Sequence, residues 1–271
     1  MSFIIDPYRF QFCSDADATA FILAAGITDT TQRQAICQLV KDLKTYGIWS
    51  KMKAIYPFCG STASQQKYNL KDPRDLDIAY RLVFNGGGTI SATGYLPNGV
   101  NSFADTKFNM TTNFNSNSDA SMGIYLRTDT SINSADMGAG NTGIGSQGIL
   151  IYSSYSGSLY IGCAFASSYI QPIPTNTDSR GFYAVVRDSG NQSQYKRGNI
   201  TINLTETRAV TTLQSLNIYI GGGNPNAGVS SNLYSDREVA FSFIGDKLTQ
   251  TEINNYYTAV QAYQTTLGRQ V

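Results

Sequence analysis

The sequence predicts a mainly β protein: an antiparallel sandwich preceded by a small helical N-terminal region and closed by a C-terminal helix. Apolar residues recur at helical spacing near both ends of the chain, and from about residue 76 their period changes to two. Pairs of Gly, Asn, Asp and Ser punctuate that middle region, as expected of tight turns. Many short strands with almost no helix between them are typical of an antiparallel sandwich.

The first helices are predicted from their capping residues. Ser14 followed by Asp17 has the layout of a capping box in its weaker Asp form and opens a short helix that stops at Gly26. Thr28 or Asp29 can cap a second helix, which a later glycine ends. Residues 48–56 are expected to continue as a short helical or turn segment.

The second helix presents one apolar face, with spacing i, i+3, i+4, i+7. A unit of about 45 residues is too small to hold a good core alone, so this face must pack on the rest of the chain or on a partner. We expect it to anchor the chain, together with an exposed tryptophan that follows. The candidate interface residues are Ile36, Leu39, Val40, Leu43 and Trp49.

The strands are predicted from alternation bounded by turn residues. Tyr155-Ser156-Gly157 is expected to turn a hairpin, and Ser189-Gly190 and Arg197-Gly198 offer further positions that tolerate positive φ. The candidate strands are Ile78–Phe84, Ser102–Asn109, Ser121–Arg127, Gly148–Ser153, Ser158–Ala164, Gly181–Arg187, Gln194–Lys196, Ile200–Leu204, Leu216–Ile220 and Glu238–Ile244.

The final helix begins at a capping box, Thr249-Gln250-Thr251-Glu252, and is expected to span residues 249–267. Its apolar and tyrosine residues fall on one face at helical spacing, which predicts packing with phenol tips near solvent. Those residues are Ile253, Tyr256, Tyr257, Val260, Tyr263 and Leu267.

The composition excludes several functions. The 271 residues hold 20 Lys and Arg against 19 Asp and Glu, so a net charge of +1 lacks the electrostatic footprint of a nucleic-acid binder. The absence of histidine removes His-dependent triads, His-ligated zinc and histidine general bases. No stretch approaches the ~20 apolar residues that a membrane-spanning helix needs, so no membrane insertion is expected.

A glycosidase would need two carboxylates about 5–10 Å apart, one of them with a raised pKa. The three glutamates all have ordinary explanations, because Glu206 lies in a Thr-rich turn, Glu238 is expected in an ion pair, and Glu252 belongs to the capping box. There is no E-x-D-x-E motif and no G-x-S-x-G motif. We therefore expect a protein that is not an enzyme.

Four cysteines, Cys13, Cys37, Cys59 and Cys163, show no C-x-x-C spacing. They are expected to be small free thiols, buried or half-buried. The N-terminus has neither a basic region nor an apolar run of signal-peptide length, which predicts a product made in a cytoplasm without a cleaved signal.

The final strand and helix resemble a known unit. Residues 240–253, AFSFIGDKLTQTEI, are similar to the last strand, L-T/S-x-x-E-I turn and helix of laminin-G/pentraxin-like domains. These domains belong to the concanavalin A-like lectin/glucanase class of jelly rolls. Upstream, the stretches 182–187 and 216–222 resemble successive central strands of that class. The resemblance covers about residues 76–268 and implies a concanavalin A-like jelly-roll sandwich.

The N-terminal residues resemble a narrower group. Ala18-x-x-Phe21-Ile22 and the run from Leu39 to Phe58 are similar to a helical leader of tailed-bacteriophage virion proteins, which precedes a lectin-like sandwich. The resemblance implies a non-enzymatic virion structural protein: a capsid decoration, head fibre, or tail or spike component. The alternative is a host-surface adhesin whose sandwich binds glycans. Tyr152, Tyr155, Tyr160, Tyr169 and the stretch from Tyr95 to Phe103 supply aromatic residues for such a site.

These resemblances set the expected organisation. Residues 1–60 would form the anchoring region, 61–75 a linker, and 76–271 the lectin-like sandwich with its C-terminal helix. Expected partners are other virion proteins and further copies of this chain, a trimer among the options, with host-surface glycans in the alternative. The location would be the virion.

A bound calcium ion is a further expectation, because pentraxin-like and laminin-G domains often carry one. Hard cations need several oxygen ligands from Asp, Asn and loop carbonyls. The loop 127–136 supplies Asp129, Asn133 and Asp136, although it does not follow the twelve-residue calcium-loop pattern. Turn formation by the same side chains is the other explanation, and no other cofactor is expected.

Overall fold

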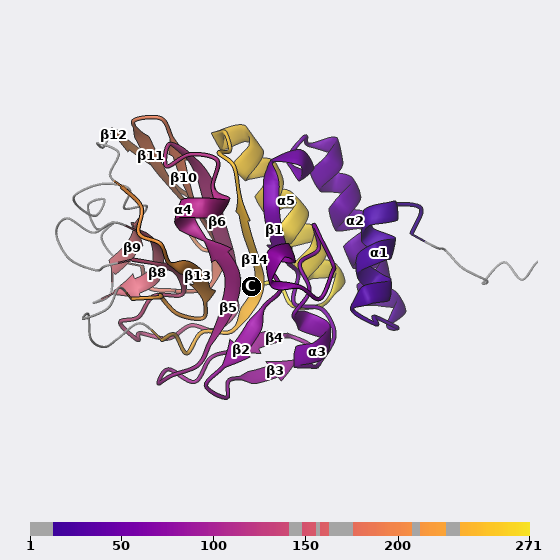
Figure 1. Cartoon of the computed structure of the whole chain (residues 1–271). Coiled ribbons are helices and arrows are strands. Elements are labelled where there is room, and N and C mark those ends of the chain that lie inside the picture. The colour runs from indigo at the N-terminus through magenta and orange to yellow at the C-terminus, as the bar shows by residue number, and fades with distance from the viewer. Residues whose placement is uncertain (1–12, 141–147, 156–157, 163–175, 208–211, 226–233) are drawn as a thin grey trace, which may run out of the picture.

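A computed structural model describes residues 13–140, 148–155, 158–162, 176–207, 212–225 and 234–271 of the chain. Within them, two antiparallel sheets pack face to face and a layer of helices covers the outer face of one sheet (Figure 1). The mainly β, antiparallel architecture with a C-terminal helix is therefore confirmed.

The larger sheet, called sheet 1, has the strand order β12-β11-β10-β6-β14-β4-β3, with β1 beside β14 as well. Its strands are β1 (Met52–Tyr56), β3 (Thr89–Ser91), β4 (Gly94–Leu96), β6 (Asp119–Leu126), β10 (Gly181–Asp188), β11 (Asn191–Arg197), β12 (Ile202–Thr207) and β14 (Val239–Gly245).

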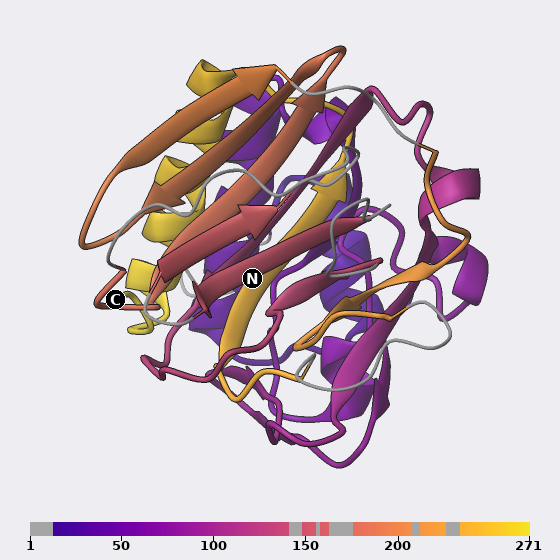
Figure 2. The same cartoon turned by 90° about the vertical axis from the view of Figure 1, so that its left-hand side faces the viewer.

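The smaller sheet, called sheet 2, has the order β2-β5-β13-β7-β8-β9 and lies in front in Figure 2, with the helices behind. Its strands are β2 (Val83–Asn85), β5 (Phe103–Asn109), β7 (Met137–Ala139), β8 (Ile149–Tyr155), β9 (Ser158–Gly162) and β13 (Asn217–Ile220). The predicted hairpin is confirmed, because β8 and β9 pair across Tyr155 and Ser158.

Sheet 1 is covered on both faces, so its central strands are apolar throughout instead of alternating. On β10, Phe182 and Ala184 contact the helical layer, whereas Tyr183 and Val185 belong to the core between the sheets. The helices are α1 (Ala16–Ala24), α2 (Thr30–Thr45), α3 (Ala63–Gln66), α4 (Met110–Asn113) and α5 (Gln250–Thr266), with 3₁₀ turns at Trp49–Lys51 and Asp77–Ala79.

The C-terminal helix α5 begins as predicted. Thr249 Oγ1 accepts from the Glu252 amide and the Glu252 carboxylate accepts from the Thr249 amide, which completes the capping box. Tyr256 and Tyr263 are buried against aromatic residues of β14, with ring centroids 4.3 Å apart for Tyr256 and Phe243. The tyrosine stripe is thus packing between α5 and sheet 1.

Three local predictions are wrong. Asp15, not Ser14, caps α1, since its carboxylate reaches two amides of the first turn. Within the segment 48–56 only residues 49–51 form the expected helical turn, whereas residues 52–56 form the strand β1, because they pair with β14. The candidate strand Ile78–Phe84 is a 3₁₀ turn followed by the short β2.

The expected boundaries at residues 60 and 75 do not separate independent units. The strand β1 belongs to sheet 1, and the following segment is tied to it by Asn69. The buried Asn69 side chain accepts from the Ile55 amide and donates to the carbonyls of Lys53 and Ala79. Helical region, linker and sandwich therefore share one packed structure.

The predicted anchoring face packs on this chain itself. Its four aliphatic residues on α2 are at most 1% exposed and belong to one core cluster with residues of α1, α5 and sheet 1, so they are not available to another subunit. Trp49 is half-buried, and Lys71 Nζ lies 3.9 Å from the centroid of its ring. Of the two partners considered for the face formed by Ile36, Leu39, Val40, Leu43 and Trp49, the rest of this chain is therefore the one observed.

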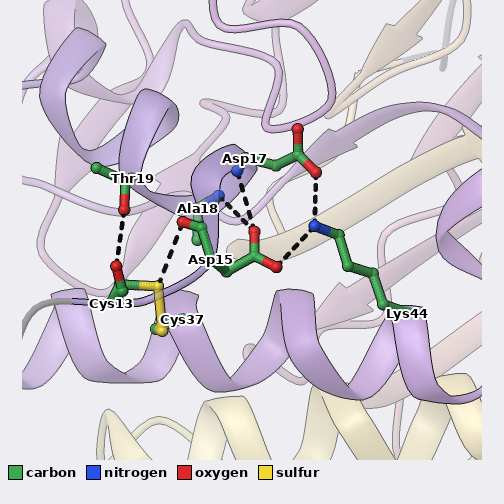
Figure 3. The surroundings of a disulfide bond; sticks show 7 residues. All are labelled: Cys13, Asp15, Asp17, Ala18, Thr19, Cys37 and Lys44. Atoms are coloured by element: carbon green, nitrogen blue, oxygen red, sulfur yellow. Dashed lines mark hydrogen bonds and ion pairs between the residues drawn. A yellow bond between two sulfur atoms is a disulfide. The ribbon is translucent and has the colours of Figure 1, made fainter.

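A disulfide joins Cys13 to Cys37, with Cα atoms 5.5 Å apart (Figure 3). The expectation of free thiols is therefore wrong for these two residues, because packing of α1 against α2 brings together cysteines whose spacing gives no signal. Cys59 is a buried free thiol, as expected, and Cys163 lies outside the described residues. Lys44 pairs with both Asp15 and Asp17 beside the bond, at 2.6 Å each.

No helix among the described residues is long and apolar enough to cross a membrane.

Candidate functional site

The outer face of sheet 2 carries an aromatic and polar surface patch. The helices cover one face of sheet 1 and sheet 2 covers the other, whereas the outer face of sheet 2 lies on the side away from the helices (Figures 1 and 2). Residues paired across neighbouring strands share a face, and Asp105 pairs with both Val83 and Tyr219. Their neighbours Ala104 and Ile220 belong to the core between the sheets, so Asp105 and Tyr219 point outward.

Three aromatic rings form a row at this patch. The rings of Phe103 and Tyr219 are stacked, with centroids 4.1 Å apart and planes 15° apart. Tyr234 continues the row, 6.0 Å from Phe103 at 26°. All three side chains are half-buried, so the row presents apolar surface with polar hydroxyl tips at its edge.

Polar groups converge beside the aromatic row. Asp105 accepts from the Lys107 amide at 2.8 Å, from Lys107 Nζ at 2.9 Å and from Asn217 Nδ2 at 3.2 Å. Burial raises the pKa of Tyr219, and the electrostatic interaction with Asp105 raises it further. The Tyr219 phenol therefore stays neutral at ordinary pH and can both donate and accept hydrogen bonds.

The backbone is irregular where these groups meet. Lys107 has a φ of 59°, in the left-handed region that non-glycine residues rarely adopt. The register also shifts here, since Asn217 pairs with Asn109 while Tyr219 pairs with Asp105. The buried Thr106 hydroxyl holds the bulge by donating to the Ile218 carbonyl at 2.7 Å. Such local strain is found more often at binding sites than elsewhere.

The candidate calcium residues are engaged with protein groups. The Asp136 carboxylate is fully buried and pairs with Arg237 at 3.0 Å, while its other oxygen accepts from the Ser153 amide at 2.7 Å. Asp129 Oδ1 accepts from the amide and the hydroxyl of Ser179. Asn133 is likewise not free, because it also interacts with another group of the protein. The positive charge beside Asp136 is thus the Arg237 guanidinium, whereas the sequence had suggested a calcium ion there.

No group of three or more His, Cys, Asp or Glu side chains able to hold a metal ion occurs among the described residues. Glu252 pairs with Lys51 besides capping α5, and Glu238 pairs with Arg127. Both glutamates therefore have the structural roles that their sequence positions predicted.

The sequence predicted only part of the surface patch. Of the aromatic residues considered for a glycan site, Phe103 lies in the row, whereas Tyr95 and Tyr152 are buried. Tyr155, Tyr160 and Tyr169 lie outside the residues whose side chains the structure describes. Tyr219 and Tyr234 were missed, because only the pairing of β5 with β13 brings residues so far apart together.

The fold is similar to solved structures at low sequence identity. A mutant of Trypanosoma rangeli sialidase displaying trans-sialidase activity aligns with a TM-score of 0.52 and 12% identity over 86% of this chain. The alignment covers 39% of the sialidase, so this chain spans well under half of that protein. Domain 4 of AbnA, a GH43 extracellular arabinanase from Geobacillus stearothermophilus, aligns with a TM-score of 0.50 and 16% identity.

The second alignment covers 76% of this chain and 98% of the arabinanase domain, whose structure is a complex with arabinotriose. At these identities the likeness concerns the fold alone. No protein-family model matches the sequence, and no curated protein matches it either.

Proposed function

We propose that the chain is a non-enzymatic, lectin-like glycan-binding protein, which binds sugar at the surface patch on the outer face of sheet 2. The observation that carries the proposal is the aromatic row of Phe103, Tyr219 and Tyr234 beside Asp105, Lys107 and Asn217. Sugar sites combine aromatic faces, which pack on C–H groups, with a few fixed hydrogen-bonding groups that orient the hydroxyls.

Each part of the surface patch has a role in this proposal. The aromatic row supplies the apolar contact, and the hydroxyl of Tyr219 and the ammonium of Lys107 supply donors at its edge. Asp105 is a positioning residue, because its carboxylate fixes Lys107 and Asn217 through hydrogen bonds. The same fold in the arabinanase domain, solved with arabinotriose, supports a sugar-binding sandwich.

The glycan-binding alternative is favoured over a purely architectural role for one structural reason. Anchoring to a neighbouring subunit through the apolar α2 face would need that face to be open, and it is buried within the chain. Placement on a phage particle, assembly with other virion proteins and self-association remain predictions from the leader's resemblance. The Cys13–Cys37 disulfide supports a working location that is oxidising, such as a virion or cell surface.

The test is a glycan array on the full chain, followed by calorimetric titration of each positive glycan and of arabinotriose. We expect Tyr219→Ala and Phe103→Ala each to weaken binding about two- to tenfold, since an aromatic contact contributes about 0.5–1.5 kcal/mol. Tyr46→Ala, a half-buried tyrosine at the end of α2, is the matched control and should bind as the parent does. Unchanged affinity in both patch variants, or no glycan bound at all, would refute the proposal.

A further inference from the structure

The interior between the two sheets is polar at one end. Three long polar side chains of β11, Gln192, Gln194 and Lys196, are at most 1% exposed. They pair in register with Arg187, Val185 and Tyr183 of β10, and the last two of these belong to the core between the sheets. The three β11 side chains therefore point toward sheet 2.

Part of this polar row lacks partners. Both amide atoms of Gln192, the Nε2 of Gln194 and the hydroxyl of Ser153 on β8 have no hydrogen-bond partner among the residues described. A buried polar group without a partner costs about 1–3 kcal/mol, so folded proteins retain such groups where a water molecule or a ligand satisfies them. These atoms include both donors and an acceptor, which matches the hydroxyl groups of a sugar.

Lys196 adds a positive charge that meets no carboxylate within the described structure. Its Nζ donates to the Asn176 amide oxygen and to the Asp178 carbonyl, and it lies 5.4 Å from the centroid of the Tyr183 ring. Burial lowers the pKa of Lys196 to about 8, in spite of the attraction of Asp178 and Asp129. A negatively charged group next to this ammonium would recover part of the desolvation cost.

The row leads to a more open part of the sandwich. On the neighbouring strand β12, Lys196 pairs with Ile202, Gln194 with Leu204 and Gln192 with Glu206. These three β12 residues are half-buried, whereas the β11 residues beside them are buried. The edge strand β9 of sheet 2 contacts β10 and β11. A ligand would therefore approach along β12 and reach inward to β11.

We propose that the inner face of β11 is a second binding site, which takes a saccharide bearing a carboxylate group. The carboxylate would lie against Lys196 and Gln194 Nε2, and sugar hydroxyls would bond to the two amide atoms of Gln192. The site lies between the sheets, on the other side of sheet 2 from the surface patch with the aromatic row. It is independent of the proposed function.

The experiment titrates the full chain with trigalacturonate and with the neutral galactose trisaccharide, by calorimetry. We expect the acidic trisaccharide to bind at least tenfold more tightly than the neutral one. Gln194→Leu should lose at least tenfold of that affinity with little loss of stability, because the buried Nε2 that it removes has no hydrogen-bond partner among the described residues. Lys196→Met should abolish the preference for the acid.

Two controls separate this site from other effects. Ser193→Ala alters the opposite face of the same strand and should bind as the parent does, since Ser193 pairs with the Thr205 hydroxyl away from the site. Tyr219→Ala should also leave trigalacturonate binding intact, which distinguishes this site from the surface patch. Equal affinity for the two trisaccharides, unchanged binding by Gln194→Leu, or a crystal structure with only ordered water between Gln192 and Gln194 would overturn the proposal.

Discussion

Removing the Cys13–Cys37 disulfide should lower the melting temperature of the chain by an amount that the closed loop determines. The two cysteines are 24 positions apart, and closing a loop of that length removes about 3.5 kcal/mol of unfolded-state entropy at 25 °C in the chain-entropy treatment. For a chain of this size, 1 kcal/mol corresponds to about 2–4 °C, so the expected decrease is roughly 7–14 °C. The Lys44 ion pairs with Asp15 and Asp17 remain in the variant but are partly exposed, and they offset little of this loss.

The assay is calorimetric melting of the parent and of a Cys13→Ser/Cys37→Ser double variant, each with and without a phosphine reductant. The reductant should lower the parent's melting temperature to that of the double variant and leave the variant unchanged. Peptide mapping of the unreduced parent should recover the two cysteine-containing peptides linked. Equal melting temperatures for the unreduced parent and the variant would refute the reasoning, because they would mean that the bond does not constrain the unfolded chain.

Two further predictions concern the buried ion pair and the N-terminal region. Arg237→Met should lower the free energy of unfolding in urea by about 3–5 kcal/mol, because it leaves the Asp136 carboxylate buried without its cation. The double variant Arg237→Met/Asp136→Leu should regain most of this loss. A loss below about 1 kcal/mol in the single variant would contradict the prediction. Deleting residues 1–60 should yield an aggregating chain, because it removes β1 from beside β14 and also removes α2, which packs on α5, so apolar residues of the helical layer become exposed. A soluble truncated chain with a cooperative melting transition would show that the sandwich folds alone.

The helix ends could be predicted from the sequence where a side chain caps its own helix. Asp29 and Thr249 satisfy amides within three residues of themselves, so the signal is local and needs no knowledge of the fold. The hairpin between β8 and β9, and the strands β5, β6 and β10, were predicted for a similar reason, since turn residues and apolar runs adjoin in the chain.

Apart from the cap of α1, which was placed one residue too early, the features that failed depend on distant parts of the chain. The strand β1 has a nearly continuous buried pattern, and only its pairing with β14 makes it a strand. Cys13 and Cys37 become neighbours only after α1 has packed on α2. Phe103 and Tyr219 become stacked only after β5 and β13 have paired, across more than a hundred residues of sequence. A single sequence carries little signal for pairing between residues that are far apart in the chain.

The layer order explains why the candidate surface is on sheet 2. In a sandwich of two sheets either sheet could offer its outer face, but here α5 packs on the outer face of sheet 1 and covers Phe182 and Phe243 there. Its inner face meets sheet 2. The faces left for a partner are therefore the outer face of sheet 2 and the margin of sheet 1 near β12, where residues are half-buried. The aromatic row lies on the first of these faces, and the polar row of β11 adjoins the second. Binding at the two places can therefore be separated by single substitutions, because no described residue of one row contributes to the other.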